Sequence, residues 1–214
     1  MGSEMCIRDR EMVSILAEDF PKLEVITGDV LVTAKEYVAD LGEYKVVANI
    51  PYQITTPILK LFMEGEVGNR PLSLTLLVQK EVGERLTAKE KKPGRGYLSV
   101  LTQYFAEVHY LLTVPAESFW PAPEVDSAII HLQIYPKRMV PIDQEKEFLR
   151  FVRTLFIHPR KQLKNVIAGI KGLHHTEVSP ILIQLGLPDT VRAQELQVAQ
   201  WVALFRASFD PKTS

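Results

Sequence analysis

Four residues that follow an apolar run are suited to hold a planar amine: Asn49, Ile50, Pro51 and Tyr52. The lone pair of an aromatic amine is delocalised into its ring, so the nitrogen attacks poorly unless both of its hydrogens are held on fixed acceptors. Asn49 offers a side-chain carbonyl, and Pro51 restricts Ile50 to an extended conformation that holds its backbone carbonyl as the second acceptor. Tyr52 supplies a flat face on which a base stacks. This arrangement is expected where such an amine is methylated, although Asn and Pro alone are equally typical of a turn that ends a strand.

An acidic residue holds a similar position one unit earlier in the chain. Asp29 follows the alternating segment 23–27, a predicted strand, and lies between Gly28 and Val30. Ligands of α/β sheets bind at the carboxyl ends of the strands. Asp29 and Asn49 are therefore expected to share one rim that holds cofactor and substrate. Without the neighbouring turn, Asp29 is better interpreted as a helix N-cap.

The composition excludes several classes of protein. The 214 residues, 46% of them hydrophobic, suffice for one domain with an appendage or for two small domains. A net charge of −1 means that any RNA surface must be local. The one cysteine, Cys6, excludes disulfides and favours a cytoplasmic protein, and the five histidines lack metal-ligand spacing, so we predict no metal. No apolar run reaches the roughly 18 residues of a membrane-spanning helix.

Apolar periodicity predicts an α/β domain followed by a small all-α domain. After segment 23–27, further strands are predicted at 44–47, 72–78, 108–114 and 125–135. Helices are predicted at 56–64, around 81–85 and at 97–105. The alternation predicts a mostly parallel, doubly wound sheet, with the last two strands paired as a hairpin.

The ends of these domains are marked by changes in pattern. Residues 136–143 contain two prolines and no periodicity, which indicates the domain boundary. Beyond it, four apolar stripes predict the helical domain over 138–214. Residues 1–10 show neither helical nor strand periodicity and are interpreted as a non-native leader.

Two segments concentrate positive charge. Residues 146–171 hold seven basic residues against one acid, which predicts a footprint on an RNA backbone. Residues 89–96 form a basic loop broken by proline and glycine; charge alone makes it more typical of a solvated surface than of a phosphate contact.

An aromatic loop precedes the last predicted strand. Phe119 and Trp120 stand beside two prolines, Pro121 and Pro123, that fix the backbone. Both aromatic residues offer planar faces. We expect Trp120 to be a core residue rather than a ligand contact.

Six ordered motifs carry a family resemblance. They are Gly28-Asp29-Val30-Leu31; Ala48 to Leu59; Val78 to Val82 with Arg85-Leu86; Pro93-Gly94 leading to Tyr97-Leu98-Ser99-Val100; Phe119 to Ala128; and Phe156 to Asn165. From about Glu11 to Phe209 the chain resembles the ribosomal RNA adenine dimethyltransferase family. The resemblance is to its KsgA-type branch, which dimethylates two adjacent adenines near the 3′ end of small-subunit (16S) ribosomal RNA. It implies a Rossmann-like class I methyltransferase sheet in residues 11–137 and an RNA-binding helical domain in residues 138–214.

The resemblance implies catalytic roles for five residues. Asn49 and the Ile50 carbonyl orient the target amine, and Pro51 fixes the turn between them and Tyr52. Tyr52 and Phe119 clamp the flipped adenine, whose extrusion from an unpaired loop is cheap.

The resemblance also implies a cofactor and partners. Gly28, Asp29, Val30 and Asn49 contact S-adenosylmethionine, with Asp29 on its adenine amine. The partner is small-subunit ribosomal RNA in the immature 30S subunit, and the protein is expected to be a cytoplasmic monomer. The implied phosphate contacts are Arg85, Lys89, Lys91, Lys92, Arg95, Arg160, Lys161 and Lys164.

One departure from the family pattern concerns the cofactor. Family members carry a glycine-rich loop after the first strand and an acid after the second, and this chain has neither. Aligning residues 9–12 places Ile7 where the acid belongs. We therefore interpret the chain as an N-terminally truncated member, without the first strand, the first helix and most of the second strand. Its own binding of cofactor is expected to be weak or absent.

Three alternatives stay open at this point. The large-subunit adenine methyltransferases of macrolide resistance share Asn-Ile-Pro-Tyr, although the continuation Val125 to Ala128 and the Arg160-Lys161 helix favour the small-subunit branch. A non-catalytic RNA-binding or ribosome-assembly factor is compatible with the missing loop. A DNA amine methyltransferase would share the amine-orienting turn but would add a target-recognition segment that is not apparent here.

Overall fold

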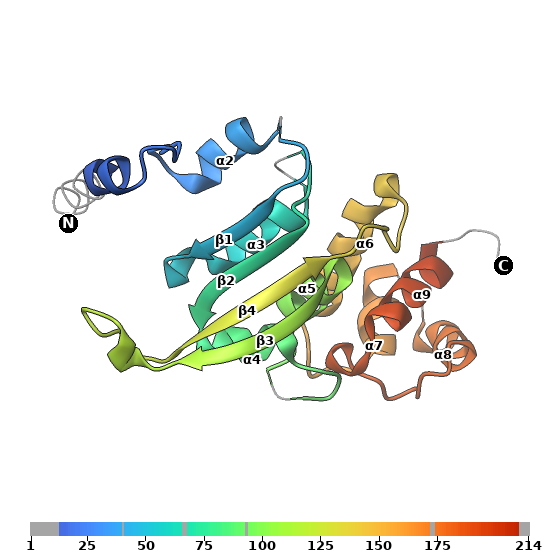
Figure 1. Cartoon of the computed structure of the whole chain (residues 1–214). Helices are drawn as coiled ribbons and strands as arrows, with labels where there is room; N and C mark the ends of the chain where they lie inside the picture. Colours follow the sequence, from blue (N-terminus) through green and yellow to red (C-terminus); the bar gives the residue numbers. More distant parts are fainter. Residues whose placement is uncertain (1–12, 40, 66–67, 93, 172–173, 210–214) are drawn as a thin grey trace.

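The chain folds into a four-stranded sheet that carries helices, with a further group of helices beyond one end of the sheet (Figure 1). The computed structural model describes residues 13–39, 41–65, 68–92, 94–171 and 174–209. Its elements are α2 (Val30–Val38), β1 (Lys45–Asn49), η1 (Tyr52–Ile54), α3 (Thr55–Met63), β2 (Ser73–Gln79), α4 (Lys80–Thr87), α5 (Tyr97–Phe105), β3 (Ala106–Val114), η2 (Ala116–Ser118), β4 (Ser127–Ile134), α6 (Ile142–Leu155), α7 (Leu163–Lys171), α8 (His175–Gln184), η3 (Ala193–Glu195) and α9 (Val198–Phe209).

The sheet is mixed rather than mostly parallel, which corrects the prediction from the sequence. Its order is β1-β2-β4-β3; β1 and β2 are parallel, whereas β4 runs antiparallel to both β2 and β3. The β3–β4 hairpin, which the sequence predicted, reverses the chain and inserts β4 beside β2. A parallel neighbour there would have needed a crossover connection.

The predicted strand at 23–27 is absent, because these residues have no regular secondary structure. A strand requires a neighbour that takes its backbone N–H and C=O groups. Within the described sheet, β1 pairs with β2 alone, and Val47 of β1 is 81% exposed. Residues 23–27 are therefore irregular, and β1 is an edge strand of the described sheet.

The sheet is covered by helices whose apolar faces follow from sequence periodicity. α4 packs against β2, β3 and β4, and α5 packs against β3. The close approach of α4 requires glycine at position 83, since a Cβ there would lie 3.0 Å from Ala128 Cβ and 3.2 Å from Tyr110 Cε2. Leu76 of β2 and Ile130 of β4 are fully buried beneath these helices.

The apolar core continues across the predicted boundary at residue 137. The ring of Tyr104 on α5 lies 4.7 Å from that of Phe148 on α6, centroid to centroid. Phe205 of α9 packs edge-on against Phe148 at 5.4 Å, and Trp201 is fully buried nearby. The helical group is therefore packed directly onto the sheet-bearing part. Among the described helices, none is long and apolar enough to cross a membrane.

Candidate functional site

The turn after β1 places the residues predicted to bind an amine at the carboxyl end of the strand. Asn49 is the last residue of β1 and is exposed, while the side chain of Ile50 is 6% exposed and anchors the turn in the core. Pro51 has φ −56° and ψ 131° and is the N-cap of η1. Thr55 is buried and donates its hydroxyl to the Tyr52 carbonyl at 3.0 Å. The turn is thus fixed from both sides, and Asn49 projects from a rigid edge.

Tyr52 is tied to the other half of the candidate site by a residue for which no role was predicted. Its hydroxyl lies 2.7 Å from the hydroxyl of Ser127, the first residue of β4, which is fully buried. This bond fixes the orientation of the half-buried Tyr52 ring. The two residues are 75 positions apart, so no local pattern could have revealed the contact.

The aromatic loop between β3 and β4 is clasped at its base by Asp126. The carboxylate accepts a hydrogen bond from the Ala116 backbone N–H at 3.2 Å and pairs with Lys80 at 3.3 Å. The backbone N–H of Lys80 also donates to the Asp126 carbonyl at 3.0 Å. The loop that carries Phe119 is therefore anchored to the carboxyl end of β2, next to the Asn49 turn.

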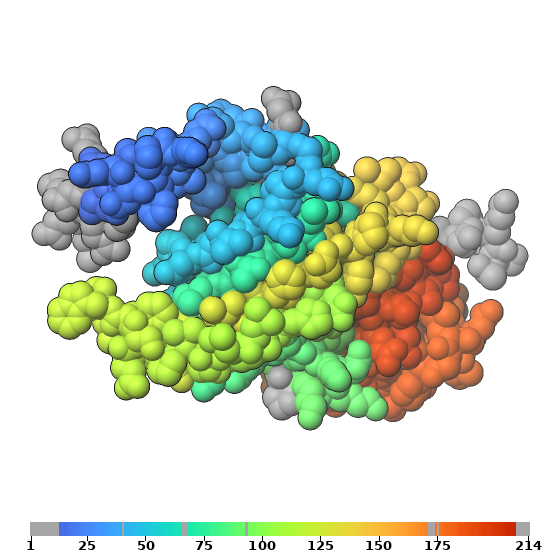
Figure 2. Space-filling model, viewed as in Figure 1, coloured from blue at the N-terminus to red at the C-terminus, as the bar shows by residue number. Residues whose placement is uncertain are grey.

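The two aromatic residues of this loop lie in different environments. Phe119 is half-buried, whereas Trp120 is 99% exposed. The prediction that Trp120 is a core residue is wrong. The loop extends beyond the end of the sheet, as the yellow-green projection in Figure 2 shows, and no layer of the protein covers the indole there.

Asp29 lies at the start of α2 as its N-cap. One carboxylate oxygen accepts a hydrogen bond from the Leu31 backbone N–H at 2.9 Å, and the Asp29 carbonyl accepts from the Thr33 hydroxyl at 3.0 Å. The first turns of α2 and α3 line a shared cavity of about 330 Å³, to which Leu31 and Thr56 contribute. Asp29 therefore lies near the end of the sheet where Asn49 is displayed, and its capping bond has a structural purpose of its own.

Gly28 is required by local geometry. Its φ is +155°, and a Cβ would lie 2.6 Å from Thr33 Cγ2. We expect Gly28→Ala to lower the free energy of unfolding by about 1–3 kcal/mol, measured by urea denaturation. The matched control is Gly42→Ala, where a Cβ meets nothing within 4 Å; it is expected to change stability by less than about 0.5 kcal/mol. Adding Thr33→Ser to Gly28→Ala removes the clashing methyl, so failure of the pair to recover any stability would contradict the steric account.

The basic residues around α4 and the following loop divide into exposed and buried groups. Lys89, Lys91 and Lys92 are exposed, and Arg85 is half-buried with its guanidinium on Glu81 at 2.5 Å. Each of the three lysines remains able to meet a phosphate.

Arg95 does not belong to this exposed group. It is 4% exposed and donates to the Ala88 carbonyl at 2.7 Å, to Gln103 Oε1 at 2.6 Å and to the Leu196 carbonyl at 3.0 Å. Burial lowers the pKa of this guanidinium. The prediction of Arg95 as a phosphate contact is wrong, because the side chain instead joins the sheet-bearing part to the helical group.

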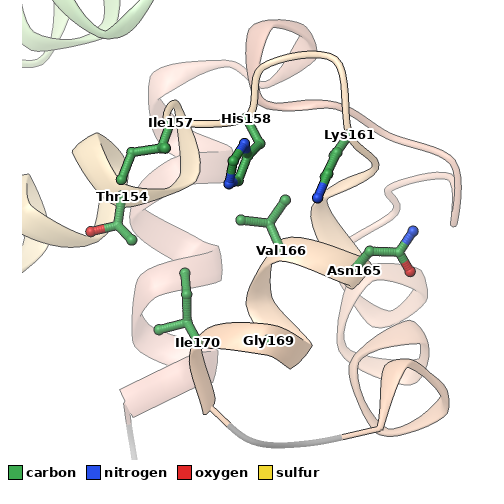
Figure 3. Close-up of a pocket in the computed structure, with 8 residues that line it drawn as sticks. All are labelled: Thr154, Ile157, His158, Lys161, Asn165, Val166, Gly169 and Ile170. Carbon is green, nitrogen blue, oxygen red and sulfur yellow. The ribbon is translucent and has the colours of Figure 1, made fainter.

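The basic motif of the helical group borders a pocket of about 300 Å³ (Figure 3). His158 and Lys161 point from the loop between α6 and α7 toward Val166 of α7. Lys161 and Arg160 are exposed, whereas Lys164 forms an ion pair with Asp189 that makes it a weaker candidate for RNA contact. The pocket is lined by Thr154, Ile157, His158, Lys161, Asn165, Val166, Gly169 and Ile170.

Metal ions and S-adenosylmethionine require different side chains. Among the described residues, no group of three or more His, Cys, Asp or Glu side chains is placed to hold a metal ion. The residues predicted to contact S-adenosylmethionine, Gly28, Asp29 and Val30, lie at the start of α2. The carboxylate of Asp29 offers acceptor oxygens for an amine and Val30 an apolar surface, so these residues suit the adenine end of that cofactor.

Solved structures share this fold. A dimethyladenosine transferase from Plasmodium falciparum superposes with a TM-score of 0.72 at 21% identity, covering 90% of this chain and 74% of its own. The 23S rRNA methyltransferase ErmE superposes with a TM-score of 0.68 at 21% identity, covering 94% of this chain and 78% of its own. At this identity the likeness concerns the fold alone.

Sequence comparison identifies the family. The pattern of the family described as ribosomal RNA adenine dimethylase matches residues 7–208, a span that starts within the segment interpreted as a leader, which itself lies outside the described residues. Proteins named ribosomal RNA small subunit methyltransferase A are 38% identical over 214 residues in Synechocystis sp. (95% of this chain, 72% of the relative) and 36% over 211 residues in Nostoc sp. (92% and 75%). A relative of the same name from Clostridioides difficile is 33% identical over 204 residues (92% and 70%). The chain therefore belongs to the ribosomal RNA adenine dimethylase family.

Proposed function

We propose that this protein dimethylates the exocyclic amines of two adjacent adenines near the 3′ end of small-subunit ribosomal RNA, using S-adenosylmethionine. One observation carries the proposal: the Asn49 turn is locked by the buried Ile50 and by the Tyr52–Ser127 bond beside the loop of Phe119. Acceptors for an amine and two aromatic faces for its ring thus occupy neighbouring, fixed segments.

The residues of the turn act on the amine before and during methyl transfer. Asn49 Oδ1 and the Ile50 carbonyl accept the two amine hydrogens, which localises the nitrogen lone pair. Tyr52 and Phe119 hold the base between them, so the nitrogen stays in line with the incoming methyl group. No strong base is required, because the amine becomes acidic only once the methyl group has been added.

S-adenosylmethionine supplies the methyl group as an electrophile when bound. Gly28, Asp29 and Val30 would hold its adenine end, with Asn49 at the rim. A glycine-rich segment of the family type would hold the methionine end, so we expect the affinity for the cofactor to rise when such a segment is added before residue 11.

The RNA partner is the immature small subunit, met in the cytoplasm by a single copy of the protein. The exposed lysines of residues 89–92, with Arg160 and Lys161, supply the phosphate contacts. An unpaired loop is the preferred target, because its bases leave the stack at low cost.

The decisive experiment is a paired assay of methyl transfer to immature small subunits. The assay compares the chain as given with the chain that carries the added segment. The binding of S-adenosylmethionine to each is measured by isothermal titration calorimetry. The proposal is supported if only the extended chain binds the cofactor and produces dimethyladenine. An extended, folded chain that binds RNA but leaves adenine unmodified would favour a non-catalytic ribosome-assembly factor, and preferential methylation of large subunits would favour the macrolide-resistance type.

The pocket beside Lys161 gives a test of the helical group as an RNA surface. At Gly169 a Cβ meets nothing within 4 Å, so Gly169→Leu fills the pocket without disturbing the core. Leucine also favours an exposed helix position over glycine by up to about 0.8 kcal/mol. We expect the affinity for a hairpin RNA to fall about tenfold, which corresponds to about 1.4 kcal/mol, with thermal stability retained.

A matched substitution controls for the added side chain. Gly42→Leu adds the same bulk at an open position before β1, at the opposite end of that strand from Asn49, and is expected to bind RNA as the unmodified chain does. Equal affinities for Gly169→Leu and the unmodified chain, measured by fluorescence anisotropy, would exclude the pocket from the RNA surface.

A further inference from the structure

Trp120 is the most exposed large apolar side chain in the part of the chain that the structure describes. Its indole is 99% exposed, while the other tryptophan, Trp201, is fully buried. Large aromatic side chains gain more than other types from leaving water, and exposed ones are enriched where partners bind. The position of Trp120 therefore indicates a contact that the isolated chain does not make.

The loop presents this indole on a fixed backbone. The Ser118 N–H donates to the Pro115 carbonyl at 3.0 Å, and the Phe119 N–H donates to the Ala116 carbonyl at 3.2 Å. Asp126 closes the base of the loop through its bond to Ala116. A ligand of Trp120 is thus met by a preorganised platform, and little chain entropy is lost on binding.

Backbone conformation separates Trp120 from the ring predicted to clamp the target base. Phe119 has φ −115° and ψ 152°, an extended conformation in which successive side chains point to opposite sides. Phe119 is half-buried toward the protein, and Trp120 faces away from it. One base cannot lie against both rings, so a ligand of Trp120 is a second group beside the target.

The charge of the loop selects the kind of ligand. Residues 115–126 contain the acids Glu117, Glu124 and Asp126 and no lysine or arginine. A phosphate or an anionic lipid surface is repelled there, whereas the face of a neutral base is not. Phosphates are attracted instead to the basic residues on α4, its following loop and the helical group.

We infer that Trp120 is a stacking site for an unpaired nucleobase that flanks the target adenine. The inference rests on the proposed function, since it takes an RNA loop as the ligand. While one of two adjacent adenines is held between Tyr52 and Phe119, its neighbour has left the RNA stack and regains a planar partner on the indole. Trp120 is therefore a positioning residue that orders the loop around the reacting base.

The two tryptophans make this inference directly measurable with the chain as it is. The probe is a short RNA hairpin whose unpaired loop contains two adjacent adenines, titrated while tryptophan emission is recorded. Stacking is expected to quench Trp120, whereas the buried Trp201 contributes a constant background. Trp120→Phe is expected to lose the quenching but keep affinity within about twofold, because phenylalanine still stacks. Trp120→Ala is expected to weaken binding about 5- to 150-fold, the range for losing one base–aromatic stack.

Controls separate failure of this inference from failure of the proposed function. Val125→Ala, which trims another exposed apolar side chain of the loop, is expected to bind as the unmodified chain does. A hairpin that binds the unmodified chain and Trp120→Ala equally, without quenching, would overturn the stacking site while leaving the RNA substrate intact. A chain that binds neither this hairpin nor immature small subunits would overturn both. Quenching by a fully paired duplex of the same length would also count against a site for unpaired bases.

Discussion

Asn49→Ala is expected to slow methyl transfer about 10²- to 10³-fold, the usual effect of deleting one preorganised polar group at a reacting centre. The substitution removes the side-chain carbonyl that holds one amine hydrogen, so the lone pair of the nitrogen stays delocalised into the ring. Asn49 is exposed at the end of β1, and alanine leaves the buried Ile50 and the Tyr52–Ser127 bond in place. The fold and the RNA affinity are therefore expected to be unchanged. The measurement is single-turnover transfer of labelled methyl groups by the chain with the added glycine-rich segment.

Two further variants separate the role of Asn49 from a general effect of the turn. Asn49→Asp keeps an acceptor at the same position and is expected to lose less activity than Asn49→Ala. Gln53→Ala removes another exposed amide four residues further on and is expected to retain full activity. Equal rates for Asn49→Ala and Gln53→Ala would show that the amine is oriented by other groups.

Local sequence signals predict most helices and strands well, but they predict poorly which strands pair with one another. The helix predicted at 97–105 is α5 to the residue, and the hairpin of β3 and β4 forms as expected, because period, turn residues and length are properties of short segments. The parallel sheet was predicted wrongly because strand direction depends on which neighbour a strand meets. β4 meets β2, which ends 48 residues before β4 begins, in antiparallel register.

The errors at the candidate site have the same origin. Arg95 lies in a basic loop, and its sequence context predicts an exposed cation. Its guanidinium is instead held by the Leu196 carbonyl, 101 residues away. Trp120, which lies beside prolines, was predicted to be a core residue, but its loop extends beyond the end of the sheet. The turn after Asn49 was predictable because the end of the apolar run and Pro51 lie within a few consecutive residues, whereas the catalytic role of its residues stays a prediction.

Glu145→Ala is expected to lower the free energy of unfolding by about 3–5 kcal/mol, as expected when one partner of a buried ion pair is removed. Glu145 lies on α6 with 8% of its side chain exposed, and its carboxylate binds both Arg70 and Arg138. The Tyr104 hydroxyl donates to the same carboxylate at 3.2 Å. Burial lowers the pKa of Arg70 while Glu145 opposes that effect, so loss of the carboxylate leaves a desolvated cation behind.

The environment of Arg70 explains why water does not solvate its charge once the Glu145 carboxylate is removed. Its side chain is 13% exposed, its Nε donates to the Met63 carbonyl at 2.7 Å, and its guanidinium lies 4.3 Å from the centre of the Phe105 ring. These contacts hold the charge in place when Glu145 is gone. Arg138→Ala, by contrast, removes a cation that is 33% exposed, so it is expected to cost no more than about 1 kcal/mol.

A double substitution separates the charge from the packing. The double variant Arg70→Met/Glu145→Met removes both partners of the ion pair, and its stability is measured by urea unfolding. Replacing a buried ion pair by hydrophobic side chains often leaves stability unchanged or raises it. We therefore expect the double variant to be more stable than Glu145→Ala. Glu147→Ala, on the exposed side of the same helix, is the matched control and is expected to shift stability by less than about 0.5 kcal/mol. If Glu145→Ala and Glu147→Ala unfold at the same urea concentration, the ionic contact does not hold α6 in place. The apolar contacts of α6, such as that between Tyr104 and Phe148, would then do so.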